Sequence, residues 1–287
     1  MKSSESKKLI GVDLGGTKVA AGLVYGSNIL KQKYSLIPNS SKNEQDIIDT
    51  IIDVIDEVYD KDIEGIGIGI PSLVNREKGI VYSVQNIPSW KKVHLKEKLE
   101  NHYQKPVYLD NDANCFALGE YKYGAGKGVE NFVGITLGTG MGSGIISKGH
   151  LLIDSNCGSG EFGSIPYLDG IYEDYCSGKF FKTHYQKNGE EIYLQAKKGD
   201  PEALKAFQIF GHHLGNTIKT IMFSVDPKEI IIGGSIANSK EFFNEAMQKT
   251  INSFPYKESV NNLKLKFTNT ANIAILGAAS LYYDKTA

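Results

Sequence analysis

Apolar and polar residues follow two different spacings along this chain, one typical of strands and one typical of helices. The strand spacing comes first. The residue types in 17–25 repeat every second position, a period that is typical of a strand rather than a helix. An apolar strand that ends at Asp13 precedes them, and Gly15 and Gly16 stand between the two strands. We therefore predict a β-hairpin with a tight glycine turn, and residues 27–37 add a third strand to it.

Helical spacing follows this meander. Apolar residues at positions 47, 48, 51, 52, 55, 58 and 59 form one stripe of a helix, and Ser41 and Glu44 before them have the spacing of a capping box. Further patterns predict helices over 95–103, 113–121, 201–225, 239–254 and 275–283, and strands over 65–70, 106–110 and 229–232. Elements that alternate in this way predict an α/β fold.

The opening pattern returns in the middle of the chain. Residues 131–147 read as an apolar strand, a turn of Gly138, Thr139 and Gly140, and another strand. Because this second hairpin lies far from the first in sequence, we predict two related domains, each of which contributes a hairpin to one cleft.

Composition and charge exclude several classes of function. The 287 residues suffice for two modest domains, and a net charge of −1 gives no reason to expect a nucleic-acid or membrane partner. No apolar run approaches the roughly 20 residues that span a bilayer, and residues 1–8 lack the apolar core of a signal peptide. Cys115, Cys157 and Cys176 show no C-x-x-C spacing, so we expect a cytoplasmic protein with free thiols.

The first glycine turn has the composition of a phosphate-binding site. It matches neither a Walker loop, because Thr17-Lys18 stands in the reverse order, nor a G-x-G-x-x-G fingerprint. Gly15 and Gly16 would let backbone amides approach an anion, Thr17 would add a hydroxyl donor, and Asp13 would hold a hydrated Mg²⁺. An ordinary glycine hairpin remains the alternative.

A polar cluster stands where the strand over 106–110 ends and a helix begins. In parallel α/β sheets ligands bind at the carboxyl ends of strands. Asp112 is therefore either a helix cap or a general base that accepts a hydroxyl proton while Asn111 orients that hydroxyl. The additional polar residues, Asp110 and Asn114, are more than a cap requires.

Four further segments have both a binding and a structural explanation. Glu161 and Glu173 lie in glycine- and aromatic-rich surroundings that favour hydrogen-bonding roles over solvated surface charges. The loop with Asn86 and the single tryptophan is either a binding surface or an anchored loop. The alternating glycines and isoleucines of 65–70 and the pair Gly233-Gly234 allow close approach of either a ligand or another part of the chain.

These motifs together resemble those of the ROK sugar kinases, bacterial members of the actin-like ATPase and hexokinase superfamily. The resemblance extends over essentially the whole chain. It rests on Asp13-Leu-Gly-Gly-Thr-Lys18, Asn111-Asp-Ala-Asn114, Leu137-Gly-Thr-Gly-Met-Gly142 and Ile232-Gly-Gly-Ser235. It implies a two-domain, ribonuclease H-like α/β fold with mixed sheets, flanking helices and an interdomain cleft. The expected domains are 1–117, with the helix 274–287 packed back on it, and 118–273.

The resemblance also implies roles for individual residues. Asp112 would be the base, and ATP with Mg²⁺ would be the cofactors. Sugar hydroxyls would be bound by Asn111, Glu161, Glu173, Ser164 and Asn86. Nucleotide and phosphates would be bound by Asp13, Gly15, Gly16, Thr17, Lys18, Gly138, Thr139, Gly140, Gly233, Gly234 and Ser235, with Asp13 holding Mg²⁺ through water. Members of the family commonly form homodimers, so the resemblance also makes a homodimer possible.

Two departures from the family pattern affect these expectations. Ser164 replaces the family's histidine, which supports both the sugar and a structural zinc, and the usual cysteine cluster is replaced by Tyr167-Leu-Asp-Gly-Ile-Tyr172. Zinc needs about four Cys or His ligands. We therefore predict a member without a zinc site, in which Phe162 and the tyrosines at 167, 172 and 175 pack in its place.

The expected reaction is transfer of the ATP γ-phosphoryl group to a hexose, with O6 of glucose as first choice because both Glu161 and Glu173 are present. A kinase for N-acetylmannosamine, N-acetylglucosamine or a β-glucoside is the alternative. A sugar-binding regulatory protein with weak catalysis is the second alternative. Relatives that repress transcription carry an N-terminal helix-turn-helix, and the phosphate motif here starts at Asp13, so a DNA-binding regulator is not expected.

Overall fold

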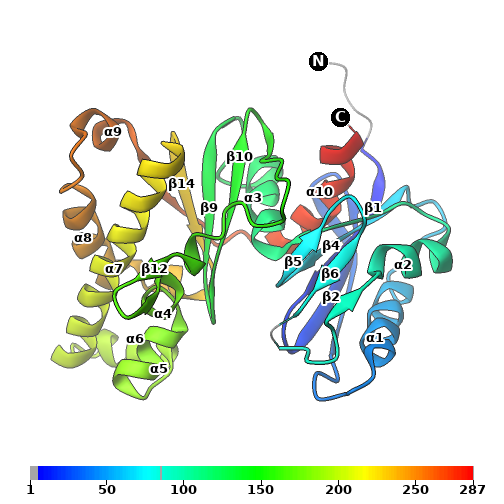
Figure 1. The fold of residues 1–287 in the computed structure, drawn as a ribbon, viewed down its shortest axis with the longest axis horizontal. Coiled ribbons are helices and arrows are strands. Elements are labelled where there is room, and N and C mark those ends of the chain that lie inside the picture. The colour runs from blue at the N-terminus through cyan, green and yellow to red at the C-terminus, as the bar shows by residue number, and fades with distance from the viewer. Residues whose placement is uncertain (1–5, 85, 287) are drawn as a thin grey trace. The chain divides into compact units, whose positions relative to one another are not determined.

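The computed structural model describes residues 6–84 and 86–286 of the chain. It contains two compact units, and both are mixed α/β (Figure 1). Unit 1 consists of Met1–Gly128, Gly149–Ser159 and Thr270–Ala287, and unit 2 consists of Val129–Lys148 and Gly160–Asn269. Within the described residues, no helix is long and apolar enough to cross a membrane.

Unit 1 is built on a five-stranded sheet in the order β3-β2-β1-β4-β8. Its strands are β1 (Lys8–Leu14), β2 (Lys18–Tyr25), β3 (Asn28–Leu36), β4 (Gly65–Ile70) and β8 (Val107–Asn111). A smaller sheet contains β5 (Leu73–Asn75), β6 (Ile80–Tyr82) and β7 (Lys92–Val93), and β11 (His150–Leu151) is a further short strand. The helices are α1 (Glu44–Asp56), α2 (Leu95–Tyr103), α3 (Asp112–Tyr123) and α10 (Ile273–Thr286).

Unit 2 contains neighbouring strands in the order β10-β9-β14-β15, with bounds β9 (Phe132–Leu137), β10 (Met141–Ser147), β14 (Glu229–Gly233) and β15 (Lys264–Phe267). A short hairpin of β12 (Pro166–Tyr167) and β13 (Gly170–Ile171) stands apart from them. The α-helices are α4 (Tyr172–Tyr175), α5 (Gly178–Tyr185), α6 (Gly189–Lys197), α7 (Pro201–Val225), α8 (Lys240–Ile251) and α9 (Lys257–Asn262). Two 3₁₀ helices are η1 (Phe162–Ser164) and η2 (Ser235–Ser239).

The two sheets share the same pattern of strand pairing around their glycine-turn hairpins. In unit 1, β1 pairs antiparallel with β2 and parallel with β4, which in turn pairs parallel with β8. In unit 2, β9 pairs antiparallel with β10 and parallel with β14, which pairs parallel with β15. Each half therefore places a glycine-turn hairpin beside the carboxyl ends of parallel strands.

The alternation of glycine and isoleucine in β4 sorts the two residue types onto opposite faces of the unit 1 sheet. Ile66, Ile68 and Ile70 are fully buried in one core cluster with residues of α1 and α2. On the other face α10 lies so close that a Cβ at Gly67 would be 1.8 Å from the Ala278 carbonyl oxygen. The close approach that these glycines permit is therefore to a helix, and the structural explanation is confirmed.

The predicted capping box of Ser41 and Glu44 before α1 is wrong, because Glu44 is the first residue of the helix. Asn43, not Ser41, is the N-cap, and its side-chain oxygen accepts a hydrogen bond of 3.1 Å from the Gln45 amide. Ser41 instead donates to the carboxylate of Asp46 at 2.6 Å. Asparagine caps helices as well as serine does, and here it stands immediately before the first helical residue.

Candidate active site

The predicted site residues divide between the two units. Unit 1 carries the first glycine turn with Asp13, Thr17 and Lys18, together with Asn86, Asn111 and Asp112. Unit 2 carries the second glycine turn with Thr139, together with Glu161, Ser164, Glu173 and Gly233–Ser235. Each group is described within its own unit.

The first glycine turn is closed by its own backbone and packs against the predicted sugar-binding residue Asn86. The Gly15 amide donates to the Lys18 carbonyl at 2.8 Å. A Cβ at Gly16 would lie 2.6 Å from the side-chain nitrogen of Asn86, so the absence of a side chain at Gly16 lets Asn86 come this close. The loop that carries Asn86 is anchored, because the buried Trp90 indole donates to the Glu44 carbonyl at 3.1 Å. The anchored-loop explanation is therefore confirmed, and Asn86 reaches the glycine turn; a binding role for Asn86 stays a prediction.

Asp13 lies at the end of β1, where it is half-buried beside the turn. Burial raises the pKa of its carboxyl, and the positive charge of Lys18 opposes this rise. Lys18 also lies over the ring of Tyr34, with 5.0 Å between its ammonium nitrogen and the ring centroid. A role for Asp13 in holding Mg²⁺ stays a prediction.

At the strand end 110–114, the residue that caps α3 and the residue predicted to be the base are two different residues. Asn111 is the N-cap of α3, and its side-chain oxygen accepts from the Ala113 amide at 2.8 Å. Its side-chain nitrogen donates to the Ser72 carbonyl at 3.3 Å. Asp112 is the first helical residue and is half-buried, and one of its carboxylate oxygens also contacts the Ala113 amide, at 2.9 Å. The cap position belongs to Asn111, so capping alone does not account for Asp112.

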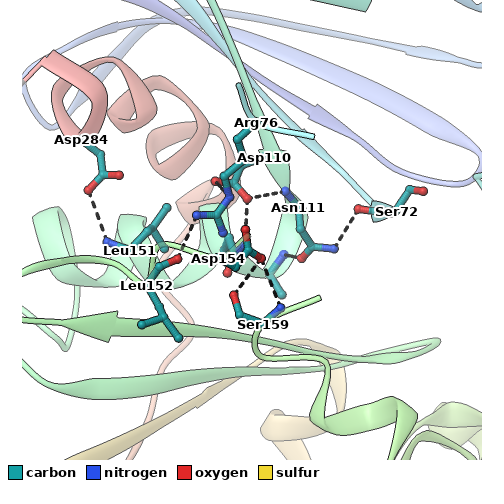
Figure 2. A network of polar contacts seen from close by, with 11 residues as sticks. Ser72, Arg76, Asp110, Asn111, Leu151, Leu152, Asp154, Ser159 and Asp284 are labelled. Atoms are coloured by element: carbon teal, nitrogen blue, oxygen red, sulfur yellow. Dashed lines mark hydrogen bonds and ion pairs between the residues drawn. The ribbon is translucent and has the colours of Figure 1, made fainter. Parts of the chain in front are cut away.

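Sequence reasoning did not identify the ion pair behind this strand end. Asp110 is 1% exposed, and its carboxylate is 2.9 Å from the Nε atom of Arg76 (Figure 2). The Nη1 atom of Arg76 also donates to the carbonyl of Leu152 at 3.0 Å. The one sequence signal for this pair was the second acidic residue, Asp110, which a cap does not need.

The second glycine turn is held from outside by α4 and α5. The Gly138 amide closes the turn by donating to the Gly140 carbonyl at 3.0 Å, and the Gly138 carbonyl accepts from the Gly178 amide at 2.8 Å. Glu173 accepts from the Met141 amide at 2.9 Å and pairs with the Lys179 ammonium at 2.6 Å. Glu173 therefore contacts the predicted phosphate turn, a position that the sequence prediction of a sugar ligand did not include.

Glu161 lies next to the same turn within unit 2. The Ser143 hydroxyl of β10 donates to the Gly160 carbonyl, and the Ser164 amide donates to the Glu161 carbonyl at 3.0 Å. The pKa of Glu161 is raised, first because surrounding protein atoms desolvate its carboxylate and then because Glu173 carries like charge. The Ser164 side chain, at the family's histidine position, is exposed. Unit 2 thus gathers two carboxylates at one glycine turn.

Gly234 has a structural reason to be glycine. Its φ is +90°, and a Cβ there would lie 2.3 Å from the Leu137 carbonyl at the end of β9. The same contact brings Gly233–Ser235 to the strand that leads into the second glycine turn. A role for this segment in adenosine binding stays a prediction.

Tyrosines occupy the segment in which the family keeps its cysteine cluster. Tyr167 stacks on Tyr172 with ring centroids 4.3 Å apart and meets Tyr175 edge-on at 5.4 Å. The Tyr167 hydroxyl contacts the Nδ1 atom of His213 on α7 at 3.1 Å. The predicted aromatic packing is therefore present. In residues 6–84 and 86–286, no group of three or more His, Cys, Asp and Glu side chains could hold a metal ion.

Because His213 belongs to this aromatic cluster, we expect the free energy of unfolding to decrease in acid. The pKa of His213 is lowered to about 4, mainly by burial and further by His212 and His184. The unfolded chain, with an ordinary histidine pKa of about 6.5, binds more protons below neutral pH, so the free energy of unfolding falls as the pH drops. The slope for this one proton is at most about 1.4 kcal/mol per pH unit, less because the ring is only half-buried.

Urea unfolding between about pH 7 and pH 5 tests this expectation. His213→Gln should lose part of the pH dependence that the wild type shows, whereas His94→Gln, on an exposed side chain, should keep all of it. Equal slopes for His213→Gln and wild type would refute the assignment of this proton to His213.

Comparison with known proteins agrees with the geometry. The model of the ROK family matches residues 9–285. Glucokinases of Thermotoga maritima and Streptomyces coelicolor are 29% and 31% identical, over 97% and 84% of this chain and 98% and 86% of those proteins. A ROK family glucokinase from Streptomyces griseus, solved in complex with glucose and AMPPNP, is 28% identical with a TM-score of 0.81, over 96% of this chain and 98% of that one.

Proposed function

The chain belongs to the ROK family and is an ATP-dependent hexose kinase, and from this premise we propose that it phosphorylates O6 of glucose with Asp112 as general base. The glucokinases that it resembles over nearly their full length support glucose as the acceptor. The position of Asp112 in unit 1 supports its role as the base.

One observation supports this assignment most strongly: the register of the unit 1 sheet. Asp13 of β1 pairs with Gly69 of β4, and Gly69 pairs with Asp110 of β8. Since neighbouring strands are about 4.8 Å apart, Asp13 and the strand end before Asp112 lie at one level of the sheet, about 10 Å apart. Both stand at the carboxyl ends of parallel strands, where α/β sheets bind ligands. A phosphate held at the first glycine turn is therefore within reach of an acceptor at Asp112.

In the proposed reaction Asp112 takes part in one proton transfer. The acceptor oxygen bonds to the γ-phosphorus while the bond between the γ-phosphorus and the ADP oxygen breaks. Asp112 accepts the hydroxyl proton as the new bond forms. Asn111 would orient the hydroxyl from the preceding position, although its side chain also caps α3. Most of the rate enhancement would come from positioning and charge stabilisation rather than from covalent chemistry.

In each unit, backbone amides of the glycine turn are the proposed phosphate donors. The Gly15 and Gly138 amides close their own turns, so the remaining amides of each turn are the proposed donors, with the Thr17 and Thr139 hydroxyls beside them. Asp13, half-buried at the end of β1 beside the turn, is the proposed residue that would hold a hydrated Mg²⁺. When bound, Mg²⁺ neutralises charge on the β- and γ-phosphates.

The proposed sugar ligands are Asn86, Asn111, Glu161, Ser164 and Glu173. In this proposal Glu173 has two roles, because it also contacts the Met141 amide and the Lys179 ammonium. A buried hydrogen-bonding site discriminates strongly between hydroxyl patterns, and the exposed Ser164 replaces one donor of the family site. That substitution keeps kinases of N-acetylmannosamine, N-acetylglucosamine or a β-glucoside as alternatives, and a sugar-binding regulatory protein with weak catalysis as a second one.

A coupled assay of ADP release tests the acceptor. We expect the highest kcat/KM with glucose in a panel of glucose, N-acetylglucosamine, N-acetylmannosamine, fructose, mannose and a β-glucoside, and little ADP release without sugar. A 6-deoxyglucose control should give no product if O6 is the acceptor. A higher kcat/KM with another sugar would replace glucose. Sugar binding with no turnover in the whole panel would favour the regulatory protein.

A further inference from the structure

All but one of the lysine and arginine residues of this chain are lysines. Lysine and arginine together number 32, and Arg76 is the only arginine. It follows β5 in unit 1, and its side chain is 11% exposed. In a chain so biased towards lysine, a single, nearly buried arginine marks a place where an ammonium group would not serve the same purpose.

The guanidinium of Arg76 makes an ion pair and a hydrogen bond through two different nitrogens. Nε is 2.9 Å from the Oδ2 atom of Asp110, and Nη1 donates to the Leu152 carbonyl at 3.0 Å. Figure 2 shows Arg76 between these two acceptors, which belong to strand β8 and to the segment 149–159. The rigid fork of arginine can satisfy both acceptors at once, whereas a lysine ammonium is a point charge on a flexible stem.

The other oxygen of Asp110 holds the residues on either side of Asp112. Oδ1 accepts from the Asn111 amide at 2.8 Å and from the side-chain nitrogen of Asn114, also at 2.8 Å. These bonds span the junction between β8 and the first turn of α3. Burial raises the pKa of Asp110, and Arg76 is the strongest of the groups that oppose this rise. An ionised Asp110 pairs with Arg76 through Oδ2 and accepts two hydrogen bonds at Oδ1, which a protonated carboxyl does less well.

We propose that Arg76 is a positioning residue for phosphoryl transfer, which holds Asp110 in place so that the β8–α3 junction presents Asp112 in one orientation. The inference rests on the proposed function, in which Asp112 is the base. Through Leu152, Arg76 also holds the segment 149–159, which continues along the chain into Gly160 and Glu161. Arg76 touches neither substrate in this proposal and acts only through these neighbours.

Two substitutions separate charge from geometry. Arg76→Met removes the ion pair with Asp110 and the hydrogen bond to Leu152, and we expect kcat to fall by about 10- to 100-fold while KM for ATP changes by less than about threefold, the signature of a misplaced base. Arg76→Lys keeps a charge near Asp110 but cannot reproduce the fork, and we expect kcat to fall by about 3- to 10-fold. Lys8→Met is the matched control, because it breaks another ion pair of unit 1, 2.7 Å from Asp60, and should leave kcat within about twofold.

Thermal melting of each variant distinguishes positioning from stability. All kinetics are measured well below the melting temperature of the least stable variant. A lower melting temperature with wild-type kcat would show that Arg76 is only a structural ion pair, and this would overturn the proposal. If Arg76→Met does not fold, Arg76→Lys decides: reduced kcat in a folded protein supports the proposal, and wild-type kcat overturns it.

A double-mutant cycle shows whether Arg76 acts through Asp112. Asp112→Asn combined with Arg76→Lys should be no slower than Asp112→Asn alone, because a base that is absent cannot be misplaced. Fully multiplicative losses would overturn the proposal. Wild-type activity of Asp112→Asn alone would instead refute the base assignment, and a slow Asp112→Asn with a normal Arg76→Lys would refute only the inference on Arg76.

Discussion

Replacing Asp112 by asparagine is expected to lower kcat by at least about 100-fold, because general-base catalysis contributes about 10²- to 10⁴-fold to rates of this kind. The substitution keeps the size of the side chain and an oxygen that can accept from the Ala113 amide. The N-cap of α3 is Asn111, so the helix start is retained. Initial rates of ADP release at saturating sugar and ATP measure the effect, and KM for ATP should change little.

The control for this prediction is an aspartate that also stands in the first turn of a helix. Asp46→Asn on α1 removes an exposed carboxylate that bonds Ser41 and Asn43, and it should leave kcat within about twofold. If Asp112→Asn kept wild-type activity, Asp112 would be reduced to a residue that begins a helix, and another group would have to accept the proton.

Replacing Gly67 by alanine is expected to prevent or severely weaken folding of unit 1. The new Cβ would lie 1.8 Å from the Ala278 carbonyl oxygen and 2.6 Å from its carbonyl carbon, and both belong to the backbone of α10. Overpacking a core costs about 1–3 kcal/mol when side chains can move, and here a strand or a helix must move instead, so we expect at least about 3 kcal/mol. Urea unfolding followed by circular dichroism measures this loss.

Gly158→Ala is the matched control, because a Cβ there would meet only the Asn156 carbonyl oxygen, at 4.0 Å. It should change the free energy of unfolding by less than about 1 kcal/mol. A Gly67→Ala protein as stable as this control would mean that α10 does not pack against β4 as closely as described. Activity is not the readout for either variant, since Gly158 precedes the proposed sugar-binding loop.

Local patterns in the sequence were enough to predict most elements. Pro201 begins α7 as a proline at the first helical position should, and the stripe of isoleucines from position 47 forms the buried side of α1. The cap of that helix was placed on the wrong residue, because Asn43 and Ser41 are both good caps and only the backbone path selects one. Both glycine hairpins were predicted from strand alternation around Gly15-Gly16 and Gly138–Gly140.

The contacts of the candidate site were less predictable, because they join residues far apart in the chain. Glu173 was predicted to bind the sugar, but its bond to the Met141 amide, which spans 32 positions, was not predicted. Arg76 and Leu152 are 76 positions apart. No spacing rule links such pairs, since their distance depends on how sheets and helices pack rather than on the period of one element.

The sequence alone determined the α/β alternation, the two glycine hairpins and the polar strand end with Asp112, because each is encoded by neighbouring residues that share a strand or a helical turn. Only the tertiary structure decided why β4 alternates glycine with isoleucine and which residues contact Asp110 at the strand end before Asp112. Those answers depend on α10 packing on one face of the sheet and on Arg76 reaching a carboxylate from β8 and a carbonyl from the segment 149–159. Contacts of that kind exist only after distant segments have come together, so no local pattern can carry them.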